Sequence, residues 1–137
     1  MVWHGTLEGK LHPVGFRVVT EDMRSLGLRR NPNILTYPVG EWFCLPRAQI
    51  KRDEGDWGGI WVAISVSGAR RLQEYMQENY DCETRIFLAY LRDVLHVAGN
   101  YRIKTSGVYL ADEIKEGDMR ELSRTYDLRN NIKPQYQ

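Results

Sequence analysis

The chain has 137 residues, a length that fits one domain able to hide roughly two-thirds of the surface that its unfolded form exposes. Hydrophobic residues make up 42% and charged residues 27%, which excludes a disordered or fibrous protein and predicts a soluble globular one. The 19 Lys and Arg against 18 Asp and Glu give a net charge of +1, so the chain as a whole has no field that would draw it to nucleic acid or to an acidic membrane.

The segment 1–59 predicts short strands separated by loops. Apolar and β-branched clusters alternate with stretches rich in Gly, Pro, Asn and charged residues, as expected between strands. The predicted elements are a strand around Trp3, a turn containing Gly9, Pro13 and Gly15, strands at 16–19 and 42–45, a loop at 26–37 with a short extended piece at 34–37, and an exposed loop at 46–59.

The middle of the chain predicts a strand, a helix and a second strand. Residues 60–64 are apolar at both parities, which is typical of a strand covered on two faces. Ser67 is a candidate N-cap for a helix of about three turns, whose apolar face continues through Leu72 and Met76. Residues 85–91 predict a second buried strand. A turn at 99–100 then leads to strands at 101–104 and 108–111, which we expect to pair as a hairpin.

The order of these elements predicts an α+β domain. Its helix can cover only part of the strands, so we expect a small mixed or antiparallel sheet with one main covering helix. This single domain is expected to span residues 1–114. The polar extension at 115–137 is expected to carry a short helix over 118–126, because a capping-box pattern begins there, followed by a loose tail.

Two further features bear on sites and location. The cysteines, Cys44 and Cys82, lack C-x-x-C or Cys/His spacing, so no metal site is expected, and one disulfide between them stays open. No run approaches the roughly 18 apolar residues of a membrane helix, and no apolar leader begins the chain. We therefore expect a cytoplasmic protein without a membrane span.

Four short motifs occur along the chain in the same order as in a known protein fold. They are VWHGT at 2–6, SLGLRRN at 25–31, GGIWVAISVSGARRLQEYM at 58–76 and NYRIKTSGVYLADEI at 100–114. Together they resemble the ADP-ribosyltransferase fold, in its poly-ADP-ribose-polymerase-like branch. The resemblance implies a domain that binds NAD or a related nucleotide between the first strand and the strand at 60–64 with its following helix.

The resemblance also assigns contacts on the first strand. His4, Gly5 and Thr6 match the His-Gly-Thr segment that holds the nicotinamide end of NAD in that family. His4 would bond the adenosine ribose, and the backbone of Gly5 would pair with the carboxamide.

Further along the chain, some residues match the site residues of that family and one residue differs from them. Trp61 stands where the family has a tyrosine that stacks on nicotinamide, and Ser65 and Ser67 would supply polar contacts. Asn100 occupies the place of the catalytic glutamate. A neutral amide supports poorly the positive charge that develops as nicotinamide leaves, so catalysis would be weakened or lost.

A second branch of the same fold uses an arginine, a Ser-Thr-Ser strand and a late glutamate. Arg17, the segment 65–67 and Glu113 form a loose copy of that set, in which Val66 replaces the threonine. We rank this interpretation below the one based on His4.

Two other classes of function stay open. A set of cationic side chains interleaved with Trp42, Tyr37 and Trp57 would suit single-stranded nucleic acid, although nearby acidic residues balance them. The cationic residues are Arg29, Arg30, Arg47, Lys51, Arg52, Arg70 and Arg71. The missing glutamate also favours a noncatalytic interaction module of viral or mobile-element type, which would need no catalytic set.

Overall fold

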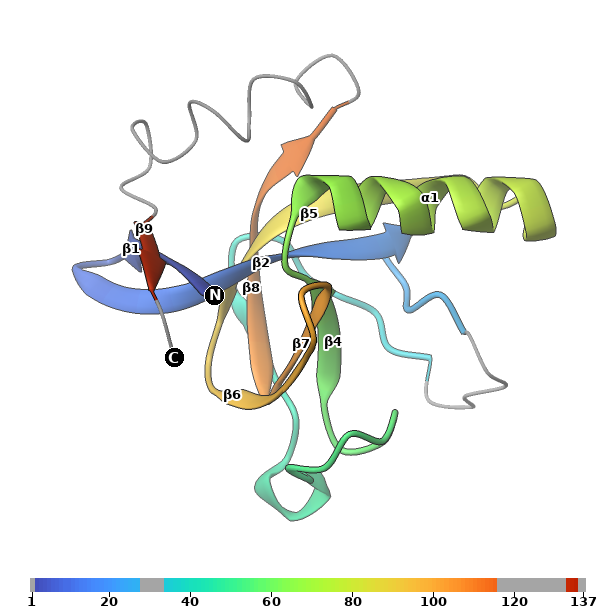
Figure 1. Cartoon of the computed structure of the whole chain (residues 1–137). Coiled ribbons are helices and arrows are strands. Elements are labelled where there is room, and N and C mark those ends of the chain that lie inside the picture. Colours follow the sequence, from blue (N-terminus) through green and yellow to red (C-terminus); the bar gives the residue numbers. More distant parts are fainter. Residues whose placement is uncertain (1, 28–33, 116–132, 136–137) are drawn as a thin grey trace.

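The computed structural model describes residues 2–27 and 34–115, together with the backbone of 133–135. In this part of the chain a nine-stranded sheet and one α-helix form the fold (Figure 1). All ladders between the described strands are antiparallel, so the predicted α+β domain with a mainly antiparallel sheet and one covering helix is confirmed. The short helix predicted at 118–126 lies outside the described residues.

The strands follow the order β3-β8-β5-β2-β4-β7-β6, while β1 pairs with β2 and β9 beside this path. Strand β9 falls within the extension at 115–137 and pairs with the beginning of β1. The bounds are β1 Val2–Leu7, β2 Lys10–Thr20, β3 Trp42–Cys44, β4 Ile60–Ala63, β5 Thr84–Leu91, β6 Val94–Ala98, β7 Arg102–Thr105, β8 Gly107–Ile114 and β9 Lys133–Gln135, with a 3-10 turn η2 at Arg47–Gln49 and helix α1 at Val66–Tyr80.

Two pairs of consecutive strands are halves of longer, bent strands. Two residues, Arg92 and Asp93, separate β5 from β6, and Ser106 alone separates β7 from β8. Because β5 pairs with β8 and β6 with β7, these four strands make one long bent hairpin. Strand β2 joins β5 to β4, and β4 joins β7. The pairings therefore close into a ring, as in a small barrel.

The hairpin predicted between 101–104 and 108–111 is wrong. The two segments continue one another through the bend at Ser106 and pair with different neighbours. The Ser-Gly pair there looks like a turn in the sequence, but Gly107 serves close packing instead. A Cβ at Gly107 would lie 2.5 Å from Sγ of Cys44 on β3.

The turn predicted over Gly9, Pro13 and Gly15 is shorter than expected. The reversal occurs at Glu8 and Gly9, both with positive φ, and β2 then runs through Pro13 and Gly15. Pro13 fits a strand here because it pairs with β1 alone, and the ladder with β5 begins only at the next residue.

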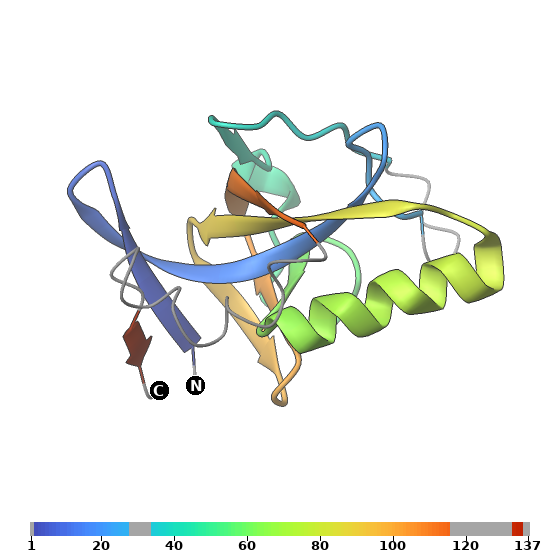
Figure 2. The ribbon, with the colours of Figure 1, turned by 90° about the horizontal axis from the view of Figure 1, so that it is seen from above.

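The main core fills the inside of the ring. Most of its buried side chains come from β2, β4, β5, β7 and β8, and they include Val62, Phe87, Ile103 and Leu110. Helix α1 packs outside, against β2 and β5, where Val18 and Ile86 meet its apolar face (Figure 2). This layering leaves the first turn of the helix beside the end of β4.

Helix α1 has the predicted apolar face but a different start. Ala69 and Met76 are buried, and Leu72 packs beside them. The N-cap is Ser65, not Ser67: Ser65 has extended backbone angles, and its Oγ accepts a 3.1 Å hydrogen bond from the backbone N–H of Gly68. Ser67 is exposed, with its Oγ 3.1 Å from that of Ser65.

Replacing Ser65 by alanine is expected to lower the free energy of unfolding by about 1 kcal/mol, because the cap that satisfies a helix N–H is lost. The matched variant Ser67→Ala should cost less than about half of that, since its hydroxyl caps no backbone group. Urea unfolding followed by circular dichroism measures both. Equal losses in the two variants would contradict the assignment of the cap.

Helix α1, with fifteen residues, is the longest in the described part of the chain, and no helix there is both long and apolar enough to cross a membrane. Cys44 and Cys82, for which the sequence leaves a disulfide open, are both free thiols.

Candidate functional site

A groove of about 1080 Å³ opens beside the start of α1. Strands β2 and β4 form its floor, and the segments 25–27, 35–37 and 49–59 form its sides, with the beginning of β7 at one end. Its lining includes four cationic residues, five aromatic residues and one carboxylate among the described residues: Arg17, Lys51, Arg71, Arg102, Phe16, Tyr37, Trp57, Trp61, Tyr101 and Asp56.

Arg17 is fixed on the floor of the groove. Its Nη1 donates a 2.7 Å hydrogen bond to the carbonyl of Trp61, and its Nη2 donates one of 3.0 Å to the hydroxyl of Tyr37. The guanidinium carbon also lies 4.8 Å from the centre of the Tyr37 ring. The Nε of Arg17 is buried without a hydrogen-bond partner in the described structure. The guanidinium is thus held in one orientation with a donor still to be satisfied.

Trp61 forms one wall together with Arg102. The guanidinium carbon of Arg102 lies 4.1 Å from the centre of the Trp61 ring, a stacked cation–π pair, and the ring of His96 meets the same tryptophan edge-on at 6.2 Å. The indole Nε1 of Trp61 is buried and has no acceptor among the described residues. Since Arg102 covers one face of Trp61, the more accessible rings are Trp57, which is 50% exposed, and Tyr101, which is 60% exposed.

The loop that carries Trp57 is anchored from below by Lys104. This lysine is fully buried, and its Nζ donates to the backbone carbonyl of Asp53 at 2.9 Å and to its carboxylate at 3.2 Å. Hydrogen bonds from the backbone N–H of Gly55 and from Lys104 lower the pKa of Asp53. Any side chain at Gly59 would overlap the stem of Lys104. The glycine thus allows the lysine to pass beneath the loop.

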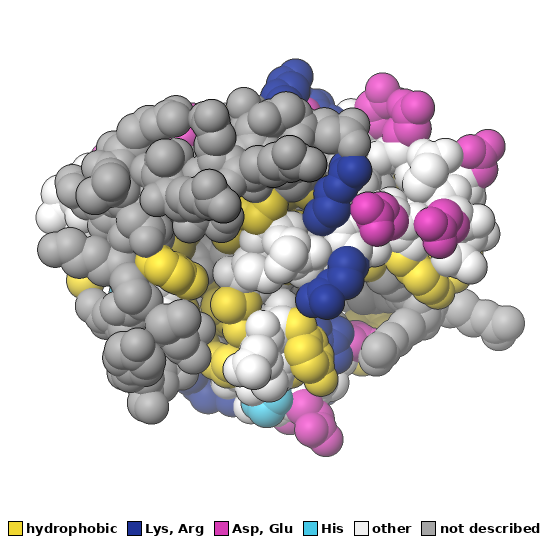
Figure 3. Space-filling view, turned by 45° about the horizontal axis from the view of Figure 1, so that its top comes forward, with side chains coloured by type: hydrophobic (Ala, Val, Ile, Leu, Met, Phe, Trp, Pro, Cys, Tyr) yellow, Lys and Arg dark blue, Asp and Glu magenta, His cyan; other side chains and the backbone are white. Residues whose placement is uncertain are grey.

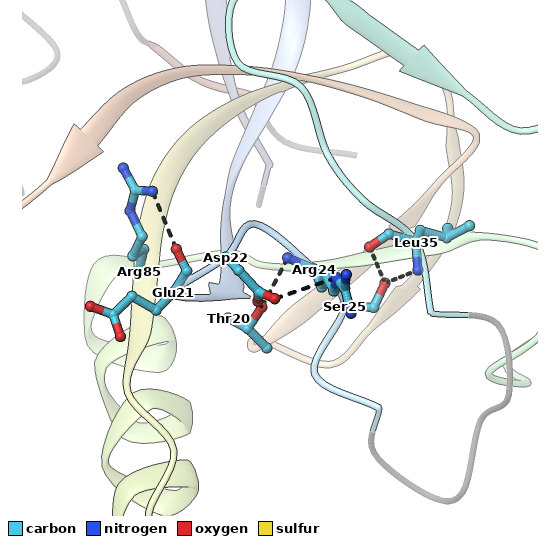
Figure 4. A network of polar contacts seen from close by, with 7 residues as sticks. All are labelled: Thr20, Glu21, Asp22, Arg24, Ser25, Leu35 and Arg85. Carbon is cyan, nitrogen blue, oxygen red and sulfur yellow. Dashed lines mark hydrogen bonds and ion pairs between the residues drawn. The ribbon is translucent and has the colours of Figure 1, made fainter.

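A polar network holds the opposite side of the groove (Figure 4). Thr20 donates to the carboxylate of Asp22 and accepts a 2.9 Å bond from the backbone N–H of Arg24. The backbone N–H of Leu35 donates to Oγ of Ser25 at 3.1 Å. These bonds join the segment after β2 to the strand-like stretch before Pro38, so that Ser25 and Leu35 both face the groove.

The charge of the groove differs from that of the whole chain. Four cations and one carboxylate line it, and that carboxylate, Asp56, lies 3.9 Å from Arg102. Figure 3 shows basic side chains gathered beside the beginning of α1 and acidic ones over its later turns. A local excess of positive charge next to flat rings suits a ligand with anionic groups and an aromatic ring.

The groove contains one of the predicted contact residues and not the others. Trp61 lines it, whereas His4, Gly5 and Thr6 do not. These three lie on β1, which pairs with β2 and β9, while Trp61 lies on β4 between β2 and β7. His4 has its Nδ1 3.2 Å from the carbonyl of Val2.

Ser65 and Ser67 also lie outside the lining, in the first turn of α1, where Ser65 serves as the cap. Asn100 lies in the exposed turn between β6 and β7 and does not line the groove, although the next residue, Tyr101, does. The backbone carbonyl of Tyr101 accepts a 2.9 Å bond from Ile64, which fixes this turn against the end of β4.

The set from the second branch is divided as well. Arg17 lies in the groove, but Glu113 is on β8, where it forms a 2.6 Å ion pair with Arg85. That hydrogen bond with Arg85 lowers the pKa of Glu113. Glu113 therefore serves the sheet and is not positioned to act in the groove.

The predicted basic surface falls into separate places. Lys51 lines the groove, whereas Arg47 and Arg52 line a second cavity. Arg29 and Arg30 lie outside the described residues.

Sequence reasoning missed the contributions of Tyr101 and Arg102. Tyr101 and Arg102 come from a turn far along the chain, and only the ring of strand pairings brings them to β4.

Comparison of the chain with family models, curated proteins and solved structures finds no match. Within the described residues, no group of three or more His, Cys, Asp or Glu side chains is placed to hold a metal ion. What this protein can bind therefore follows from the geometry and charge of the groove.

Proposed function

We propose that the protein binds a nucleotide in the groove, with NAD as the first candidate, as an ADP-ribosyltransferase-like domain. The observation that carries this proposal is the meeting of four cations and five aromatic rings with a single carboxylate among the described lining residues. A nucleotide offers the complement of this lining, since it joins an anionic phosphate group to a flat base.

Two sets of contacts support this ligand. Arg17 and Arg71 face the groove, and a guanidinium binds phosphate oxygens through paired N–H donors. The exposed rings of Trp57 and Tyr101 offer surfaces on which a base can stack. The contacts expected from the sequence place the ligand beside His4 on the first strand. This proposal places it instead against β2, β4 and the turn before β7.

Binding is proposed here with little or no turnover. Transfer of ADP-ribose from NAD needs a group that stabilises the positive charge on the ribose as nicotinamide leaves. The carboxylate of the groove, Asp56, lies beside Arg102, and Asn100 is neutral. The free thiols of Cys44 and Cys82 agree with a reducing compartment, so the proposal includes a cytoplasmic location.

Arg71→Ala is expected to weaken NAD binding about tenfold, because one charge-assisted hydrogen bond to phosphate is removed. Quenching of tryptophan fluorescence during titration with NAD measures the affinity, and Trp57→Ala should remove much of the signal. The control is Arg70→Ala, the neighbouring arginine of the same helix, which does not line the groove. No quenching at millimolar NAD, or equal losses in the two arginine variants, would refute the proposal.

Parallel titrations define the ligand class. ADP-ribose and AMP should bind if the groove recognises the adenylate half, whereas nicotinamide alone should bind weakly because it has no phosphate. Chromatography of an NAD incubation for released nicotinamide tests turnover. Failure of all these ligands would favour the interaction-module alternative.

A further inference from the structure

A second cavity, of about 730 Å³, borders the groove. Its walls come from the end of β3, the 3-10 turn η2 and the two strand bends, between β5 and β6 and at Ser106. Leu45 contributes to both linings, so the two cavities meet there. Lys51 and Arg52, although adjacent in the chain, line different cavities.

Three arginines line this second cavity. They are Arg47, Arg52 and Arg92, and none of the three has an ion pair within the part of the chain that the structure describes. The acidic side chain in the lining is Asp93, whose carboxylate already accepts a 2.9 Å hydrogen bond from Ser106. The cavity therefore holds three positive charges against one negative charge.

Backbone hydrogen bonds fix the segments that carry these arginines. The N–H of Arg92 donates to the carbonyl of Gly107 at 2.9 Å, and the N–H of Leu45 donates to the carbonyl of Ser106 at the same distance. The N–H of Ile50 closes the 3-10 turn on the carbonyl of Arg47 at 3.3 Å. These bonds tie the two strand bends to each other and to the segment after β3, and they fix the backbone at Arg47 and Arg92.

The side chain of Arg92 also contacts an aromatic ring. Its guanidinium carbon lies 5.7 Å from the centre of the Trp42 ring. The apolar side chains of Leu45, Ile50 and Leu95 form the rest of the wall. An anion that enters the cavity thus meets arginines on a partly apolar wall.

We propose that Arg47, Arg52 and Arg92 form an anion site that binds two or more neighbouring phosphate groups. Guanidinium groups match phosphate oxygens in charge and geometry. All three arginines are exposed, so a single small anion would be held weakly, whereas linked phosphates can contact several of them at once. Such phosphates occur in inorganic polyphosphate and in the backbone of single-stranded nucleic acid. The proposal uses residues outside the groove and does not depend on the nucleotide proposed there.

Calorimetric titration with inorganic tripolyphosphate at low salt tests the site. The double variant Arg47→Ala/Arg92→Ala should lose at least about tenfold in affinity. The control variant Arg24→Ala/Arg70→Ala removes the same charge from arginines that line neither cavity, and should lose less than threefold. Because tripolyphosphate can also enter the groove, Arg71→Ala provides a third comparison. Equal losses in the two double variants, or a loss caused by Arg71→Ala alone, would overturn the proposal.

A second titration distinguishes the two sources of phosphate. The affinity for a labelled single-stranded oligothymidylate is measured over a range of salt concentrations. If nucleic acid is the source, the double variant should reduce the salt slope by about 1.4, at roughly 0.7 for each phosphate that an arginine no longer neutralises. If the oligonucleotide binds equally to wild type and variant while tripolyphosphate does not, the site stands as one for free polyphosphate. If neither titrant distinguishes the double variant from its control, the site is refuted.

Discussion

Replacement of Leu88 by alanine is expected to lower the free energy of unfolding by about 2–5 kcal/mol. Leu88 is fully buried in the middle of β5, where it pairs with Phe16 of β2 and packs with Val14 and Tyr90. Because β5 is hydrogen-bonded to a strand on each side, the backbone cannot move in to fill the space left by the missing atoms. The removed side chain would leave a cavity in the face of the sheet opposite the main core.

Leu11→Ala provides the matched control, since Leu11 is 55% exposed near the start of β2. We expect it to cost less than about 0.5 kcal/mol, as is usual for exposed positions. Urea unfolding of both variants gives the comparison. A cost below about 1 kcal/mol for Leu88→Ala would show that this face of the sheet is not packed as described.

Gly15→Ala is expected to destabilise the protein by about 1–3 kcal/mol, although it adds only one methyl group. Gly15 is buried on β2, one residue before the pairing of Phe16 with Ala63 of β4. A Cβ at this position would lie 2.6 Å from Cγ2 of Val62 and 2.9 Å from the backbone carbonyl of Ala63. Val62 is itself buried and the carbonyl belongs to a strand, so neither can withdraw cheaply.

The control for this change is Gly55→Ala, in the loop before β4. The nearest atom to a Cβ there is the carboxylate oxygen of Asp53, at 3.0 Å, and this exposed side chain can give way by a few tenths of an ångström without leaving Lys104. We expect a loss below about 0.5 kcal/mol. Thermal unfolding measures the stability of both variants. NAD titration of Gly15→Ala shows whether a displacement of β4 also disturbs the contacts of Arg17 in the groove. A neutral Gly15→Ala would mean that β2 and β4 do not approach so closely.

Local patterns in the sequence predict the parts of the fold that depend on local physics. The apolar spacing of Ala69, Leu72 and Met76 identifies the helix and its buried face, and the apolar run at 85–91 identifies β5 within one residue. A strand is also expected correctly at 60–64 and is central, with β2 and β7 on its two sides. Its burial nevertheless alternates, so its two faces are covered unequally.

Other elements depend on contacts between distant segments, and the sequence patterns miss or misplace them. Gly107 resembles a turn residue because a sequence does not show that Cys44 of β3 lies against it. Strand β6 is also not predicted, although its partner β7 follows after one short turn. The predicted cap lies two residues late because Ser65 and Ser67 are chemically equivalent, and only the backbone angles separate them.

The candidate site is predictable from the sequence only in separate pieces. Trp61, Arg17 and Lys51 all line the groove, but they belong to three different hypotheses drawn from the sequence, and Arg102 belongs to none. The motif around His4 consists of residues that are adjacent in the sequence, whereas a binding surface is made by residues that the sheet brings together. The short motifs can therefore suggest a ligand class without locating the groove.

The closed ring of strand pairings has a consequence for how the chain reaches its native state. The ladder between β2 and β5 joins Val14 to Tyr90 and Thr20 to Thr84, so about half of the polypeptide must be looped out before these bonds can form. The entropy lost in closing so large a loop is not recovered until the strands meet, and proteins dominated by such distant partners fold in milliseconds to seconds. Helix α1 and the β1–β2 hairpin can form within microseconds, so that joining the two ends of the ring becomes the rate-limiting event.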